Sequence, residues 1–203
     1  MTGLALRPVV LASASAARAA ILAHAGIEVL RDPAGVDEDE IKRSFRREGL
    51  DAASCATALA ETKATRVSER HSDALVIGAD QMLDCAGTWF DKPRDRDEAR
   101  AQLMALRGKR HELVSAVAVV RNGAVIWRLV DRPRLTMRAF SDRFLDAYLA
   151  ALGDDALASV GVYQLEGLGA QLFERIEGDY FSILGLPLLP LLDFLRGHGV
   201  VTP

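Results

Sequence analysis

The residues best suited to chemistry lie around a carboxylate that follows a short β-branched run. Val76-Ile77 predicts the end of a buried strand, and Gly78 permits a sharp change of backbone direction before Asp80. Ligands of α/β sheets bind at that edge, where a carboxylate can hold a divalent metal or take a proton from water. Lys92, twelve residues later, could meet the negative charge of a phosphate. The alternative is a strand-ending turn that Asp80 caps, with Lys92 in solvent.

A second candidate site is the loop Ser13-Ala14-Ser15, which leads into a predicted helix. Its small residues let backbone N–H groups approach a ligand, its hydroxyls can donate hydrogen bonds, and the start of the helix favours anions. Arg18 adds a fixed positive charge suited to phosphate oxygens. The alternative is a serine N-cap followed by a solvent-facing arginine.

Alternating helices and strands must position these motifs. Apolar spacing and capping residues predict helices at residues 16–24, 52–70, 95–106, onward from Ser141, and 187–196. Strands are predicted at residues 8–12, up to Asp80, and at 88–90, 111–120 and 124–136, with turns at Ala86-Gly87 and Asn122-Gly123. Residues 27–36 are predicted to be extended, and the glycine-punctuated stretch 157–185 strand-like. This order predicts one α/β domain over residues 1–203, built around a central sheet.

Composition narrows the class of protein. The chain has 203 residues, of which 50% are hydrophobic and 26% are charged, as expected for a folded enzyme rather than a disordered chain. A net charge of −3 argues against broad nucleic-acid binding. Cys55 and Cys85 are too few for a disulfide framework or a zinc site. The N-terminus lacks a secretory pattern and no apolar stretch is long enough to span a bilayer, so we expect a cytoplasmic protein without a membrane partner.

A collinear set of motifs runs through nearly the whole chain. It comprises Leu11-Ala12-Ser13-Ala14-Ser15-x-x-Arg18, Val36-Asp37-Glu38, Lys63-Ala64, Gly78-Ala79-Asp80, Lys92-Pro93, Gly108-Lys109-x-His111, Gly161-x-Tyr163-x-x-Glu166-Gly167 and Gly185-Leu186-Pro187-Leu188. Each motif alone is weak, but the set in this order resembles the Maf family of nucleoside triphosphate pyrophosphatases.

The resemblance implies a fold, a reaction and a cofactor. The fold is α/β of the inosine triphosphate pyrophosphatase type, with a mixed central sheet flanked by helices and two lobes around a cleft. The reaction cleaves a nucleoside triphosphate between the α and β phosphates and releases the monophosphate and pyrophosphate. It requires a divalent cation such as Mg²⁺, Mn²⁺ or Co²⁺. The family is associated with sanitising nucleotide pools and, in some members, with cell-division arrest.

The resemblance also assigns roles to residues. Asp80 matches the family's proposed catalytic base, and Glu38 and Asp80 are the expected metal-binding carboxylates. The expected phosphate-binding side chains are Ser13, Ser15, Arg18, Lys63 and Lys92. The chemistry agrees, because attack of water on phosphorus needs a carboxylate to deprotonate the water and cations to offset the developing charge. A helix-surface role for Lys63 and a solvated acidic run around Glu38 stay open as alternatives.

Three further positions bear on the choice of substrate. Ala17 stands where relatives usually carry a second cation or an aromatic ring. Gln81 and Glu166 resemble the branch that hydrolyses 7-methyl-GTP, whereas the pyrimidine branch has Thr and Gln there. A carboxylate at Glu166 could accept hydrogen bonds from N1–H and the amino group of guanine. We therefore expect a guanine-type preference that is broader than in the closest branch.

Two other classes of protein remain as alternatives. The first is a nucleotide-sensing or septum-regulating binding protein with weak turnover, which the absence of a cation at Ala17 would suit. The presence of Asp80 weighs against it, since a pure binder needs no general base. The second is an RNA-binding module, which the acidic balance disfavours. The oligomeric state stays open, with a homodimer as one alternative.

Overall fold

The computed structural model describes residues 8–202. The chain divides into two compact units, each made of separate stretches of sequence. The first unit comprises Met1–Gln81, Ser115–Asp131 and Tyr180–Pro203, and the second comprises Met82–Val114 and Arg132–Asp179. The predicted α/β class is confirmed, with helices and a mixed sheet in the described residues. The extent of the domain and the cleft between two lobes stay predictions.

Parallel strands form the central part of the first unit. β1 (Val9–Leu11) pairs in parallel with β2 (Leu30–Arg31) and with β3 (Leu75–Cys85), where Val10 lies opposite Val76. β5 (Arg110–Arg121) and β6 (Ala124–Asp131) form an antiparallel hairpin around Asn122-Gly123. Both turn residues have positive φ, as the predicted Asn-Gly turn requires. The hydrogen-bonded order of the strands is β2-β1-β3-β5-β7-β8, in which β7 is Arg134–Met137 and β8 is Phe173–Glu177. Both β3 and β5 contain residues of the two units.

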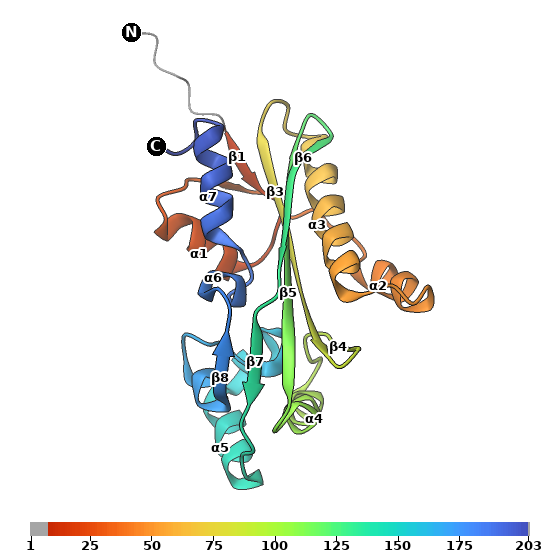
Figure 1. The fold of residues 1–203 in the computed structure, drawn as a ribbon, viewed down its shortest axis with the longest axis vertical. Helices are drawn as coiled ribbons and strands as arrows, with labels where there is room; N and C mark the ends of the chain where they lie inside the picture. The colour runs from red at the N-terminus through yellow and green to blue at the C-terminus, as the bar shows by residue number, and fades with distance from the viewer. Residues whose placement is uncertain (1–7, 203) are drawn as a thin grey trace. The chain divides into compact units, whose positions relative to one another are not determined.

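Helices cover both faces of the strands of the first unit (Figure 1). α1 (Ala16–His24) and α7 (Leu188–Gly197) lie on one face of β1 and β3, and α3 (Ala52–Ser68) lies on the other. Alternate side chains divide between two buried clusters. The cluster under α1 and α7 includes Val9, Leu11, Leu75, Ile77, Ile21, Leu22, Leu191 and Leu195. The cluster under α3 includes Val10, Val76, Ala64 and Val67. The even-numbered residues of β3 therefore face α3.

The second unit contains Met82–Cys85 of β3 and Arg110–Val114 of β5. β3 turns into β4 (Thr88–Phe90) through Ala86-Gly87, and β5 pairs with β7 (Arg134–Met137), which pairs with β8 (Phe173–Glu177). α4 (Arg96–Leu106) is capped by Asp95, and α5 (Asp142–Leu152) is capped by Ser141. These turns and caps confirm the corresponding predictions.

Two predicted segments differ from the structure. Residues 124–136 form two strands rather than one, since Pro133 has no N–H to continue a ladder and its carbonyl accepts a hydrogen bond from Leu113. The stretch 157–185 contains the 3₁₀ turns Val160–Val162 and Leu168–Leu172 and the end of another (Gly153–Leu157), with β8 as its strand and the short helix α6 (Tyr180–Ile183). The predicted extended segment 27–36 contains the short strand Leu30–Arg31 and no helix.

A helix that the sequence analysis did not predict follows that segment. α2 (Glu38–Arg47) begins at Asp37, whose side chain accepts a hydrogen bond from the Glu40 amide at 3.0 Å. Acidic residues fill its first turn and Arg46 and Arg47 its last, as the helix dipole favours. α2 packs against α3. The acidic run at Glu38 is therefore the start of a helix, and Glu38 is held at its N-terminus.

The prediction that the backbone changes direction at Gly78 is wrong. β3 continues through Gly78 and Asp80 to Cys85, so there is no change of direction at the glycine. Instead α3 approaches β3 so closely that a Cβ on Gly78 would collide with the carbonyl oxygen of Ala60 and lie 2.9 Å from the Cβ of Ala64. The glycine is needed for helix–strand contact, and that contact sets how near α3 lies to Asp80.

We expect Gly78→Ala to lower the free energy of unfolding by about 1–3 kcal/mol, the usual cost of overpacking. The added methyl group meets backbone and a small side chain, which cannot rotate away. Gly197→Ala is the matched control, because a Cβ there meets nothing within 4 Å. Urea unfolding of both variants checks this, and equal stability of Gly78→Ala and the wild type would contradict the tight contact.

Among residues 8–202, no helix is both long enough and apolar enough to cross a membrane.

Candidate active site

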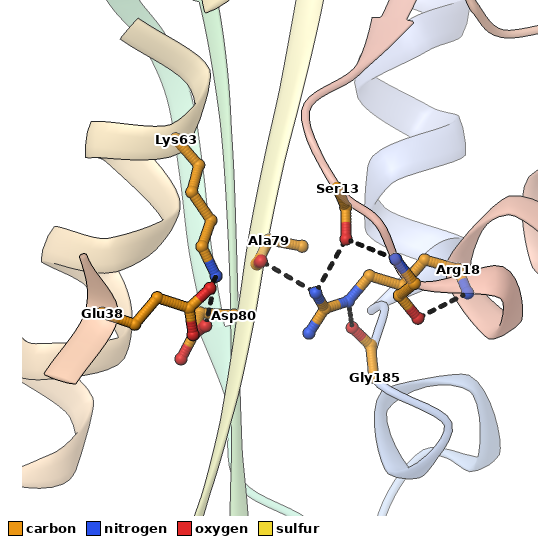
Figure 2. A network of polar contacts seen from close by, with 8 residues as sticks. Ser13, Arg18, Glu38, Lys63, Ala79, Asp80 and Gly185 are labelled. Carbon is orange, nitrogen blue, oxygen red and sulfur yellow. Dashed lines mark hydrogen bonds and ion pairs between the residues drawn. The ribbon is translucent and has the colours of Figure 1, made fainter. Parts of the chain in front are cut away.

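A lysine between two carboxylates forms the centre of the candidate site. The Lys63 ammonium lies 2.7 Å from Oδ1 of Asp80 and 2.7 Å from Oε1 of Glu38. The three side chains come from α3, β3 and the first turn of α2, and they converge as Figure 2 shows. Lys63 and Asp80 are buried, whereas 42% of the Glu38 side chain is exposed. The alternative of a helix-surface role for Lys63 is therefore wrong.

The second carboxylate oxygen of Asp80, Oδ2, is the atom of the site best suited to take part in a reaction. Oδ2 is buried, and among the described residues it has no hydrogen-bond partner. Burial raises the pKa of Asp80, and the nearby charges of Lys63 and Arg18 offset only part of that effect. A buried oxygen with a raised proton affinity is suited to accept a proton from water or to bind a cation.

The pKa of Glu38 is shifted in the opposite direction. Burial alone would raise its pKa, but the charge of Lys63 and its hydrogen bond, with Lys42 and Arg18 adding to them, together lower the pKa of Glu38 below its ordinary value. The two carboxylates on Lys63 therefore differ in proton affinity: Glu38 favours the ionised state, and Asp80 holds a proton more readily. Pairs with divergent pKa values are typical of sites that do acid–base work.

Arg18 is partly buried, and its guanidinium is bonded to the protein rather than free in solvent. Its Nε donates to the carbonyl of Gly185 at 2.8 Å, and Nη1 donates to the carbonyl of Ala79 at 2.9 Å and to Ser13 Oγ at 3.2 Å (Figure 2). Burial lowers the pKa of Arg18, and the charges of Asp80 and Glu38 oppose this. An arginine remains cationic nevertheless. These three bonds do not use the two N–H groups of Nη2. Arg18 can therefore hold Ser13, Ala79 and Gly185 together and still donate hydrogen bonds to a phosphate.

The serine loop starts α1. Ser15 is the N-cap, and its Oγ accepts a hydrogen bond from the Arg18 amide at 3.3 Å. The Oγ of Ser13 accepts from the Ser15 amide at 3.2 Å and from Arg18, which leaves its hydroxyl proton for another acceptor. Ala17 is exposed in the first turn of α1. The loop thus combines a helix N-terminus with a buried hydroxyl.

Gln81 points away from Asp80. As the next residue on β3 it faces the other side, where its Nε2 lies 2.8 Å from Ser115 Oγ, 3.0 Å from the Ser182 carbonyl and 3.1 Å from the Ile183 carbonyl. An amide nitrogen has two protons, so these three acceptors use its donor capacity. The side-chain oxygen remains for a ligand, and a part for Gln81 in base selection stays a prediction.

Lys92 and Glu166 belong to the second unit, whereas the residues described above belong to the first. Both side chains are exposed; Lys92 follows β4, and Glu166 lies in the turn between Val160–Val162 and Leu168–Leu172. Their expected parts in the site stay predictions. Sequence analysis missed Lys42, the buried lysine one helical turn after Glu38. The i,i+4 spacing of an acid and a lysine was the signal that could have indicated it.

Comparison with known proteins identifies the family of this chain. The family model described as Maf-like protein matches residues 8–198. This chain belongs to the Maf family. A nucleoside triphosphate pyrophosphatase of Paramagnetospirillum magneticum is 58% identical over 95% of this chain and 100% of the relative. A nucleoside triphosphate pyrophosphatase of Granulibacter bethesdensis is 55% identical over 95% of this chain and 98% of the relative. A 7-methyl-GTP pyrophosphatase of Rhizobium meliloti is 50% identical over 95% and 96%.

Maf membership also bears on the two alternative classes. Relatives matched over nearly their full length carry the names of enzymes, and neither a binding module nor an RNA-binding protein is among these three names. The resemblance to the Maf family is thus confirmed, whereas the roles of the individual site residues stay predictions.

Proposed function

We propose that this Maf protein hydrolyses nucleoside triphosphates between the α and β phosphates, giving the monophosphate and pyrophosphate. One observation carries the proposal: the buried, unpartnered Oδ2 of Asp80, on a carboxylate that Lys63 holds at 2.7 Å. The names of the full-length relatives support the same activity. The class of reaction follows from a general base beside several cations in one unit of the fold.

Each residue of the site has a separate role in the proposed reaction. Asp80 accepts a proton from the attacking water through Oδ2, while Lys63 keeps the carboxylate fixed through Oδ1. The water oxygen forms a bond to the α phosphorus, the bond from that phosphorus to the bridging oxygen breaks, and pyrophosphate leaves. Arg18 and the Ser13 hydroxyl can donate to phosphate oxygens, which gain charge as the bond breaks. Such donors are fixed before the reaction because they are already bound to the backbone.

Asp80→Asn should reduce turnover by about two to four orders of magnitude, the range for loss of a general base. It should do so without loss of stability at neutral pH. Because the folded protein raises the pKa of Asp80, this group stabilises the fold most below its ordinary pKa of about 3.9. That contribution is lost as pH rises through the folded-state pKa. Asn does not titrate, so the variant gains stability relative to the wild type as pH rises above about 4.

Steady-state kinetics with pyrophosphate detection and urea unfolding at several pH values measure both effects. Turnover of Asp80→Asn within a few-fold of the wild type would contradict the assignment of Asp80 as the general base. A stability difference that shifts toward the wild type as pH rises would contradict the raised pKa of Asp80.

We also propose that the site uses a divalent cation. Glu38 and Asp80 are hard oxygen ligands, and Oδ2 of Asp80 is a buried oxygen in need of a partner. The described residues contain no group of three or more His, Cys, Asp or Glu side chains that could hold a metal alone. Two carboxylates fit Mg²⁺, which is commonly held by one or two carboxylates together with substrate phosphates. When bound, such an ion would neutralise phosphate charge.

Metal removal should abolish activity. We expect a chelator to eliminate pyrophosphate release and Mg²⁺, Mn²⁺ or Co²⁺ to restore it, because oxygen ligands without His or Cys suit these ions. Glu38→Gln should raise the Mg²⁺ concentration needed for half-maximal rate, since it replaces one charged ligand. Full activity in excess chelator would show that the carboxylates act without a metal.

We further propose that the substrate is a purine triphosphate, with 7-methyl-GTP favoured. A relative named 7-methyl-GTP pyrophosphatase, 50% identical, supports this. Glu166 is exposed, so a carboxylate is accessible there to the N1–H and amino group of guanine. Methylation at N7 makes the purine cationic and would add a favourable charge interaction with that carboxylate. Uracil and thymine offer no such pair of donors.

Glu166→Gln tests the proposed preference for a guanine nucleobase. The wild type should show a higher kcat/KM for 7-methyl-GTP and GTP than for UTP and dTTP. The substitution should reduce the ratio of 7-methyl-GTP to GTP most strongly, because it removes the charge but keeps the shape. Glu174→Gln, which removes an exposed carboxylate from the same unit, is the control. A wild-type preference for UTP or dTTP, or an unchanged ranking in Glu166→Gln, would contradict the proposal.

A further inference from the structure

Arg18 and Gln81 are both bonded to the short segment at the end of α6. Nε of Arg18 donates to the carbonyl of Gly185 at 2.8 Å, as Figure 2 shows. Nε2 of Gln81 lies 3.0 Å from the carbonyl oxygen of Ser182 and 3.1 Å from that of Ile183. This segment therefore holds one side chain from α1 and one from β3, and all five residues belong to the first unit.

The chemistry of its partners fixes the orientation of the Gln81 amide. Carbonyl oxygens only accept hydrogen bonds, so the atom that faces Ser182 and Ile183 must be the nitrogen. Ser115 Oγ donates its own proton to the Ser182 carbonyl at 2.7 Å, so it accepts from Gln81 Nε2, which lies 2.8 Å away. Both protons of the nitrogen are thus used. The oxygen Oε1 is left as an acceptor of fixed position that cannot become a donor.

Oε1 of Gln81 and Nη2 of Arg18 lie against the same backbone position. A Cβ placed on Gly185 would be 3.8 Å from Oε1 and 3.7 Å from Nη2. Neither atom has a hydrogen-bond partner among the described residues, and both are accessible to solvent. Nη2 has two N–H groups to donate, whereas Oε1 only accepts. The protein therefore presents an accessible donor and an accessible acceptor side by side.

This pair of atoms is close in the fold to the candidate base. Nη1 of Arg18 donates to the carbonyl of Ala79, the residue before Asp80, and Gln81 is the residue after it. In the proposed reaction Asp80 takes a proton from water that attacks the α phosphorus. A guanidinium bonded to the adjacent strand carbonyl is suited to donate to the oxygens of that phosphate.

We propose that Arg18 and Gln81 together bind the part of the substrate where the α phosphate joins the ribose. Nη2 donates to the α phosphate, and Oε1 accepts a hydrogen bond from a ribose hydroxyl. This inference rests on the function proposed above. The ribose is attached directly to the α phosphate, and the base lies beyond it. A ribose hydroxyl can donate to an acceptor, which an ionised phosphate cannot do. Gln81 thus recognises the sugar, and other residues select the base.

The experiment measures binding of guanosine monophosphate (GMP) by calorimetry, without turnover, and compares it with the 2′-deoxy and 3′-deoxy analogues. The wild type should bind one analogue about three to ten times more weakly than GMP, as expected for loss of a hydrogen bond between neutral groups. The analogue that binds weakly identifies the hydroxyl. Gln81→Met keeps the length of the side chain but removes the acceptor. This variant should bind GMP and that analogue with affinities equal to within about 1.5-fold.

Ser115→Ala is the matched control. It removes one partner of Nε2 but leaves the carbonyls of Ser182 and Ile183 to hold the amide, so Oε1 stays in place. The ratio of affinities for GMP and the analogue should stay within about twofold of the wild-type ratio.

Three results would overturn the proposal. The first is equal wild-type affinity for GMP and both analogues, a measurement that needs no variant and so does not depend on how Gln81→Met folds. The second is a folded Gln81→Met that retains the preference for the hydroxyl. The third is a Gln81→Met that loses a preference for GMP over uridine monophosphate while its preference for the hydroxyl is unchanged, because Gln81 would then select the base.

The two proposals fail in different ways. If the wild type releases no pyrophosphate from any triphosphate, the proposed function is wrong whatever sugar the protein prefers. If the wild type is active and binds GMP and both analogues equally, only the role of Gln81 is wrong.

Discussion

The site depends on placing the ammonium of Lys63 beside the buried carboxylate of Asp80. Isolated, either charge would be very costly away from water. Together they are tolerated because α3 lies close enough to β3 for a 2.7 Å contact. Gly78, with the small residues Ala60 and Ala64 opposite it, makes that distance possible. The geometry of the candidate base is therefore set by backbone packing two residues away from it.

Arg18 has a comparable function on the other side of β3. Its guanidinium joins the serine loop, the strand carbonyl of Ala79 and the carbonyl of Gly185, which is 167 residues away in sequence. Gln81 ties the same C-terminal segment to β5 through Ser115 and the Ser182 carbonyl. β3 thus presents Asp80 to α3 and uses its neighbours to fix the segments opposite. Rigid support of this kind is what a preorganised site requires.

Local signals accounted for most of the elements. Asp95 and Ser141 begin helices as capping residues, and Asn122-Gly123 forms the hairpin turn, because each of these depends on a few adjacent residues. α2 was missed because its inward-facing residue is a lysine, so the usual apolar spacing is lacking. Asp37, with Glu40 three residues later, was a capping signal that could have indicated this helix.

The hydrogen-bond partners of the site residues could not be predicted from the sequence, for a physical reason. The type of residue showed that Arg18 and Gln81 were polar groups of interest, but their partners are backbone carbonyls, which every residue carries and no sequence pattern distinguishes. Gly78 was correctly singled out and wrongly explained, since a glycine that permits a turn and one that permits close packing look alike in sequence.

The buried charge of Asp80 has a cost in stability that the surrounding core must offset. Burial raises the pKa of Asp80, which means that the ionised carboxylate costs stability at neutral pH. Two apolar clusters, one on each face of β1 and β3, offset that cost close to where it arises. The same low-polarity surroundings strengthen the electrostatic interactions of Lys63 and Arg18 with whatever anion enters. The burial that destabilises Asp80 is thus the condition that makes it an effective base.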